Sequence, residues 1–445
     1  MCEELYTAQC TTLGTFSLAT SCVNHQQLLA GCGYIQIRFA LAALAATGAF
    51  AQSSVSVYGT VDAAYTNYAS EGNSKSGMGN SQLGSSKLGF MGTEDLGNGL
   101  KAFFKLEAGL ANDSGNGKAS NSSNQAGGTG NGGAGALTSV GGTQGLAFAR
   151  YSYVGLTGGF GEVRLGRDYT SAFQLGVASV DPFGTNGPAD SSVMTLNLAA
   201  RNALATTSGA SNMIGYITPS MNGISAKLQA FFGENSSAST TRAIAGNPGN
   251  GTDGDGYSAQ IGYTNGPIFA SFGQQVTKGT AAAAVNAALN VTTGAGLLTG
   301  TGIPAATGDY TQRGLSVSYD MGVAKLAFTN AREELIGTAS TATNASNLIG
   351  VTVPVGAINY KASYVRSVQN TGAAGAVDNV GTLVGVGADY ALSKRTTLYT
   401  TYGRVSNENG AAFSAGLAGG AAGSTLTSAA NPSSTGLAIG VFHAF

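Results

Sequence analysis

The sequence predicts an all-β chain that closes into a 16-stranded antiparallel transmembrane β-barrel, and three observations predict it. Apolar and polar residues alternate along many short runs, tight turns alternate with long polar connections, and no apolar run reaches the roughly 20 residues of a spanning helix. Only 10% of the 445 residues are charged, against roughly 25% in soluble domains. This composition favours a membrane protein built from strands.

The clearest hairpin is Ser85–Leu110, which reverses at Leu96–Gly99. Side chains that alternate with period two belong to a strand, because successive residues point to opposite sides of the pleat. A soluble sandwich buries its apolar face, whereas a transmembrane barrel turns it to lipid and lines its interior with the polar face. The apolar face of the second run consists of Leu100, Ala102, Phe104, Leu106, Ala108 and Leu110, and the polar face of Lys101, Phe103, Lys105, Glu107 and Gly109.

The rest of the chain decides between these two folds, because the pattern repeats to give 16 strands. Short turns and long connections alternate, as in transmembrane barrels with short periplasmic turns and long external loops. The even number brings the first and last strands together, where they can close the sheet. The further short turns are Gly158–Gly159, Met221–Gly223, Asn265–Gly266, Met321–Gly322, Val355–Gly356 and Ser393–Arg395. The long connections are Tyr68–Gly84, Ala111–Gly145, Asp168–Ala210, Gly233–Gly254, Val276–Asp309, Glu333–Asn347, Val368–Val380 and Val405–Ser434.

Two segments divide the chain: residues 1–51, interpreted as a signal peptide with an atypical extension, and residues 52–445, the barrel. Arg38 is followed by a short apolar run that ends in Ala49-Phe50-Ala51, which predicts cleavage before Gln52. Residues 1–37 contain no Lys or Arg, which indicates a wrongly assigned start, with a genuine N-terminal domain as the alternative. All four cysteines precede residue 52, so neither a disulfide framework nor a zinc site is expected: Cys2, Cys10, Cys22 and Cys32.

The composition also argues against several functions. Only His25 and His443 are histidines, so the barrel has little from which to build a Ser-His-Asp site, and we expect neither an enzyme nor a cofactor or metal. The formal net charge is −1 and no basic run is present, which argues against nucleic acid as a partner. The glycines of Gly155–Gly159 lack the Gly-Lys-Ser/Thr of a phosphate-binding loop.

The last strand ends the chain on an aromatic residue. Leu437, Ile439, Val441, His443 and Phe445 share one face. We interpret Phe445 as the terminal aromatic of an outer-membrane barrel, which the barrel-assembly machinery reads. A chance apolar terminus is the alternative.

Four segments carry a resemblance to a known family: SKLGFMGTEDLGNGLKAFFKLE, ARYSYVGLTGGFGEVRLGRDY, the start QSSVSVYGTVDA and the ending GVFHAF. Together they resemble the general porins of β-proteobacteria over essentially all of residues 52–445. The resemblance implies a homotrimer in outer-membrane lipid, passive diffusion of small hydrophilic solutes and ions, and a third long loop, Asp168–Ala210, folded into the channel. Family members often carry Arg where this chain has Lys87 and Met91, which implies a weaker preference for anions.

Turning the apolar faces outward assigns most of the strand charges to the lumen. The expected inward cations are Lys87, Lys101, Lys105, Arg150, Arg164, Lys227, Lys325 and Lys361, and the expected inward acids are Asp62, Glu107, Glu162 and Asp320. Charges that face each other across a narrow zone set an electrostatic filter. We expect a basic wall that faces an acidic loop and favours anions. Its constriction residues would be Lys87, Lys101, Lys105, Arg150, Arg164 and Arg167 on the wall and Asp168, Asp181 and Asp190 on the loop.

Alternatives remain open at this point. The lumen charges could be solvated without any role in selectivity. Many tyrosines, among them Tyr58, Tyr151, Tyr153 and Tyr399, stand near strand ends or on the outer face, where some are expected to form interfacial girdles. Besides a porin, the chain could be a surface-exposed β-barrel adhesin without channel function, or a barrel enzyme or autotransporter unit.

Overall fold

The computed structural model describes residues 54–117, 146–176, 179–196, 208–233, 252, 254–279, 309–336, 341–370, 372, 375–411, 413–416 and 433–445. The chain divides into two units, Met1–Ser54 and Val55–Phe445, and the described residues belong to the second apart from Ser54. The expected signal peptide, residues 1–51, lies outside them. No helix among the described residues is long and apolar enough to cross a membrane.

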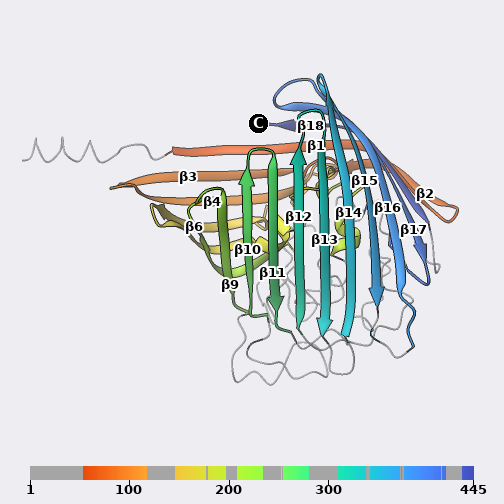
Figure 1. Ribbon diagram of the computed structural model, residues 1–445. Helices are drawn as coiled ribbons and strands as arrows, with labels where there is room; N and C mark the ends of the chain where they lie inside the picture. Colours follow the sequence, from red (N-terminus) through yellow and green to blue (C-terminus); the bar gives the residue numbers. More distant parts are fainter. Residues whose placement is uncertain are drawn as a thin grey trace, which may run out of the picture. The chain divides into compact units, whose positions relative to one another are not determined.

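Eighteen strands and two short helices make up the described part of the second unit (Figure 1). The strands are β1 (Ser54–Ser70), β2 (Asn73–Asn80), β3 (Lys87–Gly97), β4 (Leu100–Ala111), β5 (Asn116–Gly117), β6 (Tyr151–Gly158), β7 (Gly161–Tyr169), β8 (Gly209–Ile217), β9 (Ile224–Phe231), β10 (Gly256–Asn265), β11 (Ile268–Thr277), β12 (Tyr310–Asp320), β13 (Lys325–Ile336), β14 (Thr341–Val355), β15 (Ile358–Asn370), β16 (Asn379–Ala391), β17 (Thr396–Glu408) and β18 (Ser434–Ala444). The helices are α3 (Ser171–Gly176) and α4 (Ser192–Thr195).

The sheet closes on itself. Each main strand pairs antiparallel with its neighbours in the chain, and β18 pairs with β1 from Thr60↔Ala444 to Ser70↔Ser434. β2 pairs with the later half of β1, and β3 also pairs with β1, so β2 and β3 together occupy one strand position in the ring. β5 is a two-residue strand that pairs with the end of β4. The predicted closed barrel of 16 strands is therefore confirmed.

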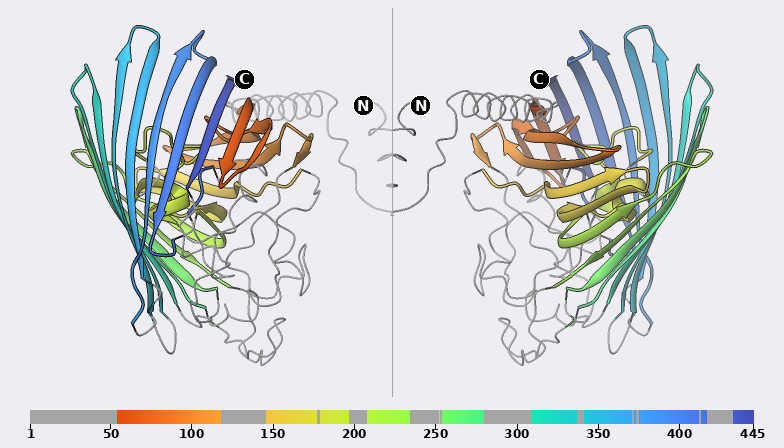
Figure 2. Two further views of the ribbon diagram at one scale, coloured as in Figure 1. Left: turned by 90° about the vertical axis from the view of Figure 1, so that its right-hand side faces the viewer. Right: turned by 90° about the vertical axis from the view of Figure 1, so that its left-hand side faces the viewer.

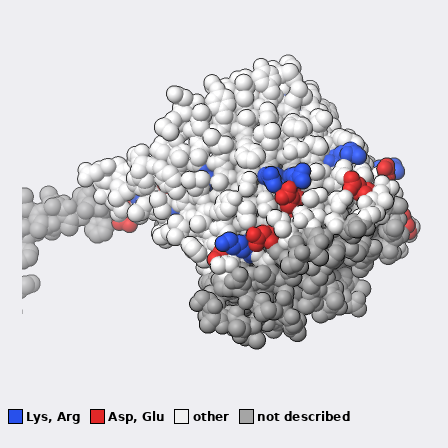
Figure 3. All heavy atoms as spheres, turned by 60° about the horizontal axis from the view of Figure 1, so that its bottom comes forward, with Lys and Arg blue, Asp and Glu red and all other residues white. Residues whose placement is uncertain are grey.

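The outer face of the wall is apolar. Exposed side chains of one parity include Leu315 and Tyr319 on β12, Phe328 on β13 and Ile349 on β14. In Figure 3 a broad part of the visible wall carries no charge, and the Lys, Arg, Asp and Glu residues in view gather in a band below it. Such an uncharged belt is the surface that a barrel presents to hydrocarbon.

The short turns lie where the sequence places them, because their backbone geometry requires particular residues. Asn98 and Gly99 both have positive φ in the β3–β4 turn, as does Gly266 in the β10–β11 turn. Asn and Gly tolerate this conformation best, which makes these dipeptides strong turn signals.

The strands extend further than predicted at the opposite end, so several of the predicted connections are too long. The segment Tyr68–Gly84 forms a hairpin that turns at Glu71-Gly72. Most of Glu333–Asn347 continues β13 and β14, and Val368–Val380 loses residues to β15 and β16. Both faces of these strand ends are polar, so the alternation that marks a strand is lost from the sequence.

The described parts of the third long connection, between β7 and β8, lie inside the wall, where α3 contacts β10, β11 and β12 (Figure 2). At its beginning, the Ser171 and Ala172 amides donate to Gln229 and Ser258 at 2.7 and 3.0 Å. At α4, the Met194 carbonyl accepts hydrogen bonds from Asn344, Ser346 and Ser367 on β14 and β15. The predicted bounds Asp168–Ala210 are wrong by a few residues, since β7 runs to Tyr169 and β8 begins at Gly209.

Inward-facing glycines let this loop approach the strand backbone closely. A Cβ on Gly403 would lie 2.0 Å from the Pro188 carbonyl oxygen, and one on Gly273 would lie 2.7 Å from the Ala172 Cα. Pro182 lies similarly close to Gly350 on β14, and Ala189 to Gly385 on β16, each 2.6 Å from the position of an added Cβ. Glycine inside a strand commonly marks such an approach. We call Gly273, Gly350, Gly385 and Gly403 the glycine track.

A second inward segment, Ser81–Ser86, interrupts the wall between β2 and β3 and supports the same loop. One oxygen of Asp62 accepts the amides of Leu83 and Gly84 at 2.6 and 2.8 Å, and the other accepts the Tyr399 hydroxyl. Asp62 is buried, so it is not the water-facing acid that the sequence predicts.

Candidate functional site

One ionic cluster on the inner wall is centred on Glu107 of β4. Arg150, just before β6, lies 2.6 Å from one carboxylate oxygen, while Lys105 and Lys87 lie 3.9 and 4.0 Å from the other. The Tyr58 hydroxyl donates to the same carboxylate at 2.8 Å. Glu107 is 1% exposed, whereas the three cations keep about a quarter of their side-chain surface exposed. A buried carboxylate thus holds three cations that still reach water.

A second cluster surrounds Asp168 at the end of β7. Arg164 and Lys227 approach the same carboxylate oxygen at 2.9 and 3.1 Å, and Arg164 also pairs with Glu162. Asp168 is 2% exposed, while Arg164 and Glu162 keep 20% and 26% of their side chains exposed, so one cation and one acid of this cluster reach water.

Arg167 reaches the wall through a β-bulge. The β7–β8 register shifts between Gly166 and Asp168, which leaves Arg167 as the additional residue. Its guanidinium donates to the Ala149 carbonyl at 2.5 Å and to the Ser211 hydroxyl at 2.7 Å. Both of these partners are neutral.

Tyrosine rings lie under the cations. The Lys105 amino group lies 4.0 Å from the Tyr151 ring centroid, and the Arg164 guanidinium lies 4.8 Å from that of Tyr153. Because a cation over a ring face is attracted by the ring's electrons, these tyrosines hold the two cations against the wall.

The six cations Lys87, Lys105, Arg150, Arg164, Arg167 and Lys227 form what we call the basic wall. Three carboxylates belong to the same network, Glu107, Glu162 and Asp168, which leaves a net charge of +3. An open pocket of about 320 Å³ lies against it, with Lys105, Arg164 and Lys227 in its lining. This surface can attract and orient an anion but offers no nucleophile–base pair.

Lys101 is a predicted constriction residue that lies apart from this network. It stands at the short-turn end of β4, paired with Asp95 and Thr157, and its side chain is exposed. The structure thus brings five of the six predicted wall cations together with Lys227 and leaves Lys101 out.

The loop acids do not face the basic wall across open space as expected. Asp168 lies in β7 and is ion-paired to the wall itself. Asp181 and Asp190 are buried inside the loop, where they accept the amides of Phe183 and Ser192 at 2.9 and 2.7 Å. The reason is that these short side chains stabilise the loop's own turns.

Burial of this acidic pair gives the loop a pH dependence. Burial, with a smaller contribution from the nearby Asp181 carboxyl, raises the pKa of Asp190 to about 7, and burial raises the pKa of Asp181 to about 6. A carboxyl whose folded pKa is raised destabilises the fold once it ionises in the unfolded chain, so the penalty grows upward from the ordinary pKa of 3.8 and is complete above about pH 7. Asp190→Asn should therefore raise the unfolding temperature at pH 8 and change it little at pH 4. Equal shifts at both pH values would contradict this.

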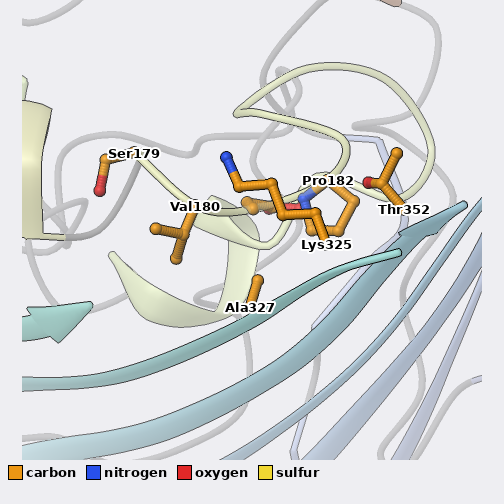
Figure 4. Close-up of a pocket in the computed structure, with 7 residues that line it drawn as sticks. Ser179, Val180, Pro182, Lys325, Ala327 and Thr352 are labelled. Carbon is orange, nitrogen blue, oxygen red and sulfur yellow. The ribbon is translucent and has the colours of Figure 1, made fainter. Parts of the chain in front are cut away.

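Behind the loop lies a second, smaller pocket of about 260 Å³ (Figure 4). Val180 and Pro182 line it from the loop, and Lys325, Ala327 and Thr352 from β13 and β14. Figure 4 shows the Lys325 side chain beside Pro182. Lys361 of β15 pairs with Asp389 of β16. Inward cations thus occur on this side of the lumen too.

The family described as Gram-negative porin matches residues 39–410 of the chain. The chain belongs to this porin family. It is 32% identical over 414 residues to outer membrane porin protein 32 of Delftia acidovorans, across 91% of this chain and 98% of that protein. It is 25% identical to major outer membrane protein P.IB of Neisseria lactamica, across 83% of this chain and 93% of that protein.

Solved structures agree with the fold. An anion-selective porin from Comamonas acidovorans superposes with a TM-score of 0.67 at 28% identity, covering 88% of this porin and all of that chain. OmpT of Vibrio cholerae, at 16% identity and a TM-score of 0.55, supports the fold alone. The protein is thus an outer-membrane porin with a channel-forming barrel, and the adhesin alternative has no support.

The residues that the sequence places wrongly are mainly four tyrosines, which point into the lumen of the porin and not outward. Tyr58, Tyr151 and Tyr153 contact lumen charges, and Tyr399 binds Asp62, so none of these four belongs to an outer girdle. The inward direction of Tyr153 could have been predicted from the sequence, because the apolar Val154 and Leu156 mark the opposite face of β6 as the outer one. Among the described residues, no group of three His, Cys, Asp or Glu could hold a metal ion.

Phe445 lies at the seam where the ring closes. Its backbone exchanges hydrogen bonds with Gly59 of β1 at 3.0 and 3.2 Å. A Cβ on Gly59 would lie 2.3 Å from the Phe445 ring, so the ring covers the glycine, and about half of Phe445 stays exposed.

Proposed function

We propose that this porin is a diffusion channel for small hydrophilic solutes with a preference for anions. The observation that carries the proposal is the basic wall, in which cations outnumber carboxylates six to three and two of the three carboxylates, Glu107 and Asp168, are almost fully buried. A like-signed lining at a narrow zone raises the local concentration of counter-ions. The similarity to a porin that is named anion-selective supports the same preference for anions.

In this proposal Lys105, Arg164 and Arg167 attract the anion, with Lys87, Arg150 and Lys227 behind them. Asp168, Glu107 and Glu162 hold the cations in place and reduce the net positive charge of the wall. Asp181 and Asp190 hold the loop in shape and do not filter cations. Lys101 adds to the field at the short-turn end of the lumen. No step of this function requires catalysis or a cofactor.

The wider setting is part of the same proposal. We infer a homotrimer, with short turns on the periplasmic side, a signal peptide at residues 1–51 and Phe445 as a contact for the barrel-assembly machinery. Nothing in the mechanism of diffusion depends on these additions.

The reversal potential across a salt gradient in a planar bilayer tests the anion preference. Neutralising two of the six wall cations in Lys105→Gln/Arg164→Gln should lower the chloride-to-potassium permeability ratio at least about two-fold. The matched control is Lys101→Gln, which also removes a lumen cation but lies outside the network. A wild-type channel that prefers potassium, or a control that behaves like the double variant, would contradict the proposal.

A further inference from the structure

A row of arginines lies on the outer face of the barrel, at the end opposite the short turns. Arg313, Arg332, Arg366 and Arg404 stand on β12, β13, β15 and β17; the last three are exposed and Arg313 is half-buried. Arg366 and Arg404 share their strand faces with Tyr364 and Tyr402, which are exposed as well. We call these four residues the outer arginine row, and we propose that it is a docking surface for the phosphate groups of anionic lipids.

The height of the row places it in the outer part of the apolar band, towards the edge of the membrane. Arg332, Arg366 and Arg404 each stand about seven to eight residues along the strand from its short-turn end. At roughly 3.3 Å per residue and a tilt of about 40°, this corresponds to about 18–20 Å of height. The apolar band of such barrels is about 25 Å tall, and the cost of a lipid-facing charge falls steeply towards its edge.

Two of the four arginines have no acidic partner within the part of the chain that the structure describes. Glu334 lies 3.1 Å from Arg313 and 2.9 Å from Arg332, so one carboxylate serves two guanidinium groups. Within the described residues, Arg366 and Arg404 form no ion pair. Their cross-strand neighbours are uncharged: Asn347 and Thr382 for Arg366, and Val384 and Thr435 for Arg404. The row therefore keeps an excess of positive charge.

The chemistry of the row selects a phosphate. A guanidinium presents a planar fork of donors that matches two phosphate oxygens, and it is weakly hydrated, which suits the membrane interface. Arg366 and Arg404 lie on strands two apart, or roughly 10 Å, so they can contact one headgroup or two adjacent ones. Tyr364 and Tyr402 lie just below, as interfacial aromatic residues do. A second copy of the same face would instead place arginines against arginines.

Native mass spectrometry of the purified, folded porin tests the surface, with phosphatidylglycerol as the anionic probe and phosphatidylcholine as the zwitterionic one. Each interfacial arginine contributes about a five-fold gain in affinity for an anionic surface, so Arg366→Gln/Arg404→Gln should weaken phosphatidylglycerol binding by about 25-fold. Phosphatidylcholine binding should not change. The control variant Lys394→Gln/Arg395→Gln removes two exposed cations at the β16–β17 turn, at the other end of the barrel, and should keep full binding.

Equal phosphatidylglycerol affinity in the wild type and the Arg366/Arg404 variant would overturn the proposal. A change in oligomeric state with unchanged lipid binding would assign the row to an interface between copies and overturn it as well. Heat-modifiable gel mobility shows whether each variant is folded. If the double variant fails to fold, Arg366→Gln and Arg404→Gln are measured singly, each with an expected five-fold loss.

Discussion

Glu107→Gln should destabilise the barrel by on the order of 3 kcal/mol and at the same time increase its preference for anions. The carboxylate is 1% exposed and lies within 4.0 Å of Arg150, Lys105 and Lys87, so its loss leaves three neighbouring cations without their shared counter-charge. Removing one partner from a buried ionic network costs more than the network itself contributes, because the remaining charges stay desolvated. The net charge of the wall would rise by one.

Two measurements separate these effects. The unfolding temperature, followed by heat-modifiable gel mobility, should fall, while the reversal potential in a planar bilayer should shift further toward the anion limit. The matched control is Glu162→Gln, because Glu162 is 26% exposed and its partner Arg164 keeps Asp168. A control that is destabilised as much as Glu107→Gln would show that the Glu107 cluster has no special role in stability.

Gly403→Ala should displace the loop between β7 and β8 from its position against the wall. The new methyl would lie 2.0 Å from the Pro188 carbonyl oxygen and 2.5 Å from its carbon, and both are backbone atoms that cannot rotate away. Overpacking of this kind costs roughly 1–3 kcal/mol, and the loop can relax only toward the lumen. We therefore expect a lower unfolding temperature and a smaller single-channel conductance.

The control for this prediction is Gly77→Ala on β2, where an added Cβ would meet no atom within 4 Å. Both glycines lie in strands, so the loss of backbone freedom on substitution is the same. If the two variants have the same conductance and stability, the glycine track does not hold the loop.

Much of the barrel could be predicted from the sequence because its signals are local. The turn at Asn98-Gly99 needs positive φ, and the alternation in β4 places Lys105 and Glu107 on one face without any knowledge of partners. The strand ends near Glu333 and Asn344 could not be found this way. Both residues are buried by contacts from Tyr310 and from the distant Met194, and neither contact has a local signature.

The prediction that acidic residues face the basic wall was wrong for a related reason. The sequence shows that Asp181 and Asp190 lie in the long connection. Whether their carboxylates point into the loop or toward the lumen depends on how that loop folds on itself. Asp168 was assigned to the loop because a bulge at Arg167 hides the continuation of β7. Lys227, expected only as one inward cation among many, joins the wall because Asp168 attracts it.

The pairing of β1 with β18 has a consequence for how the molecule forms. Thr60 and Ala444 are neighbours in the ring although nearly the whole barrel separates them along the chain. A contact between such distant residues requires closure of a very long loop, so it carries a high entropic barrier and forms slowly. Until that junction is made, two open edges expose unpaired amides and carbonyls, and the hydrocarbon of a bilayer cannot solvate them. Completion of the cylinder and insertion are therefore expected to be a single, concerted event.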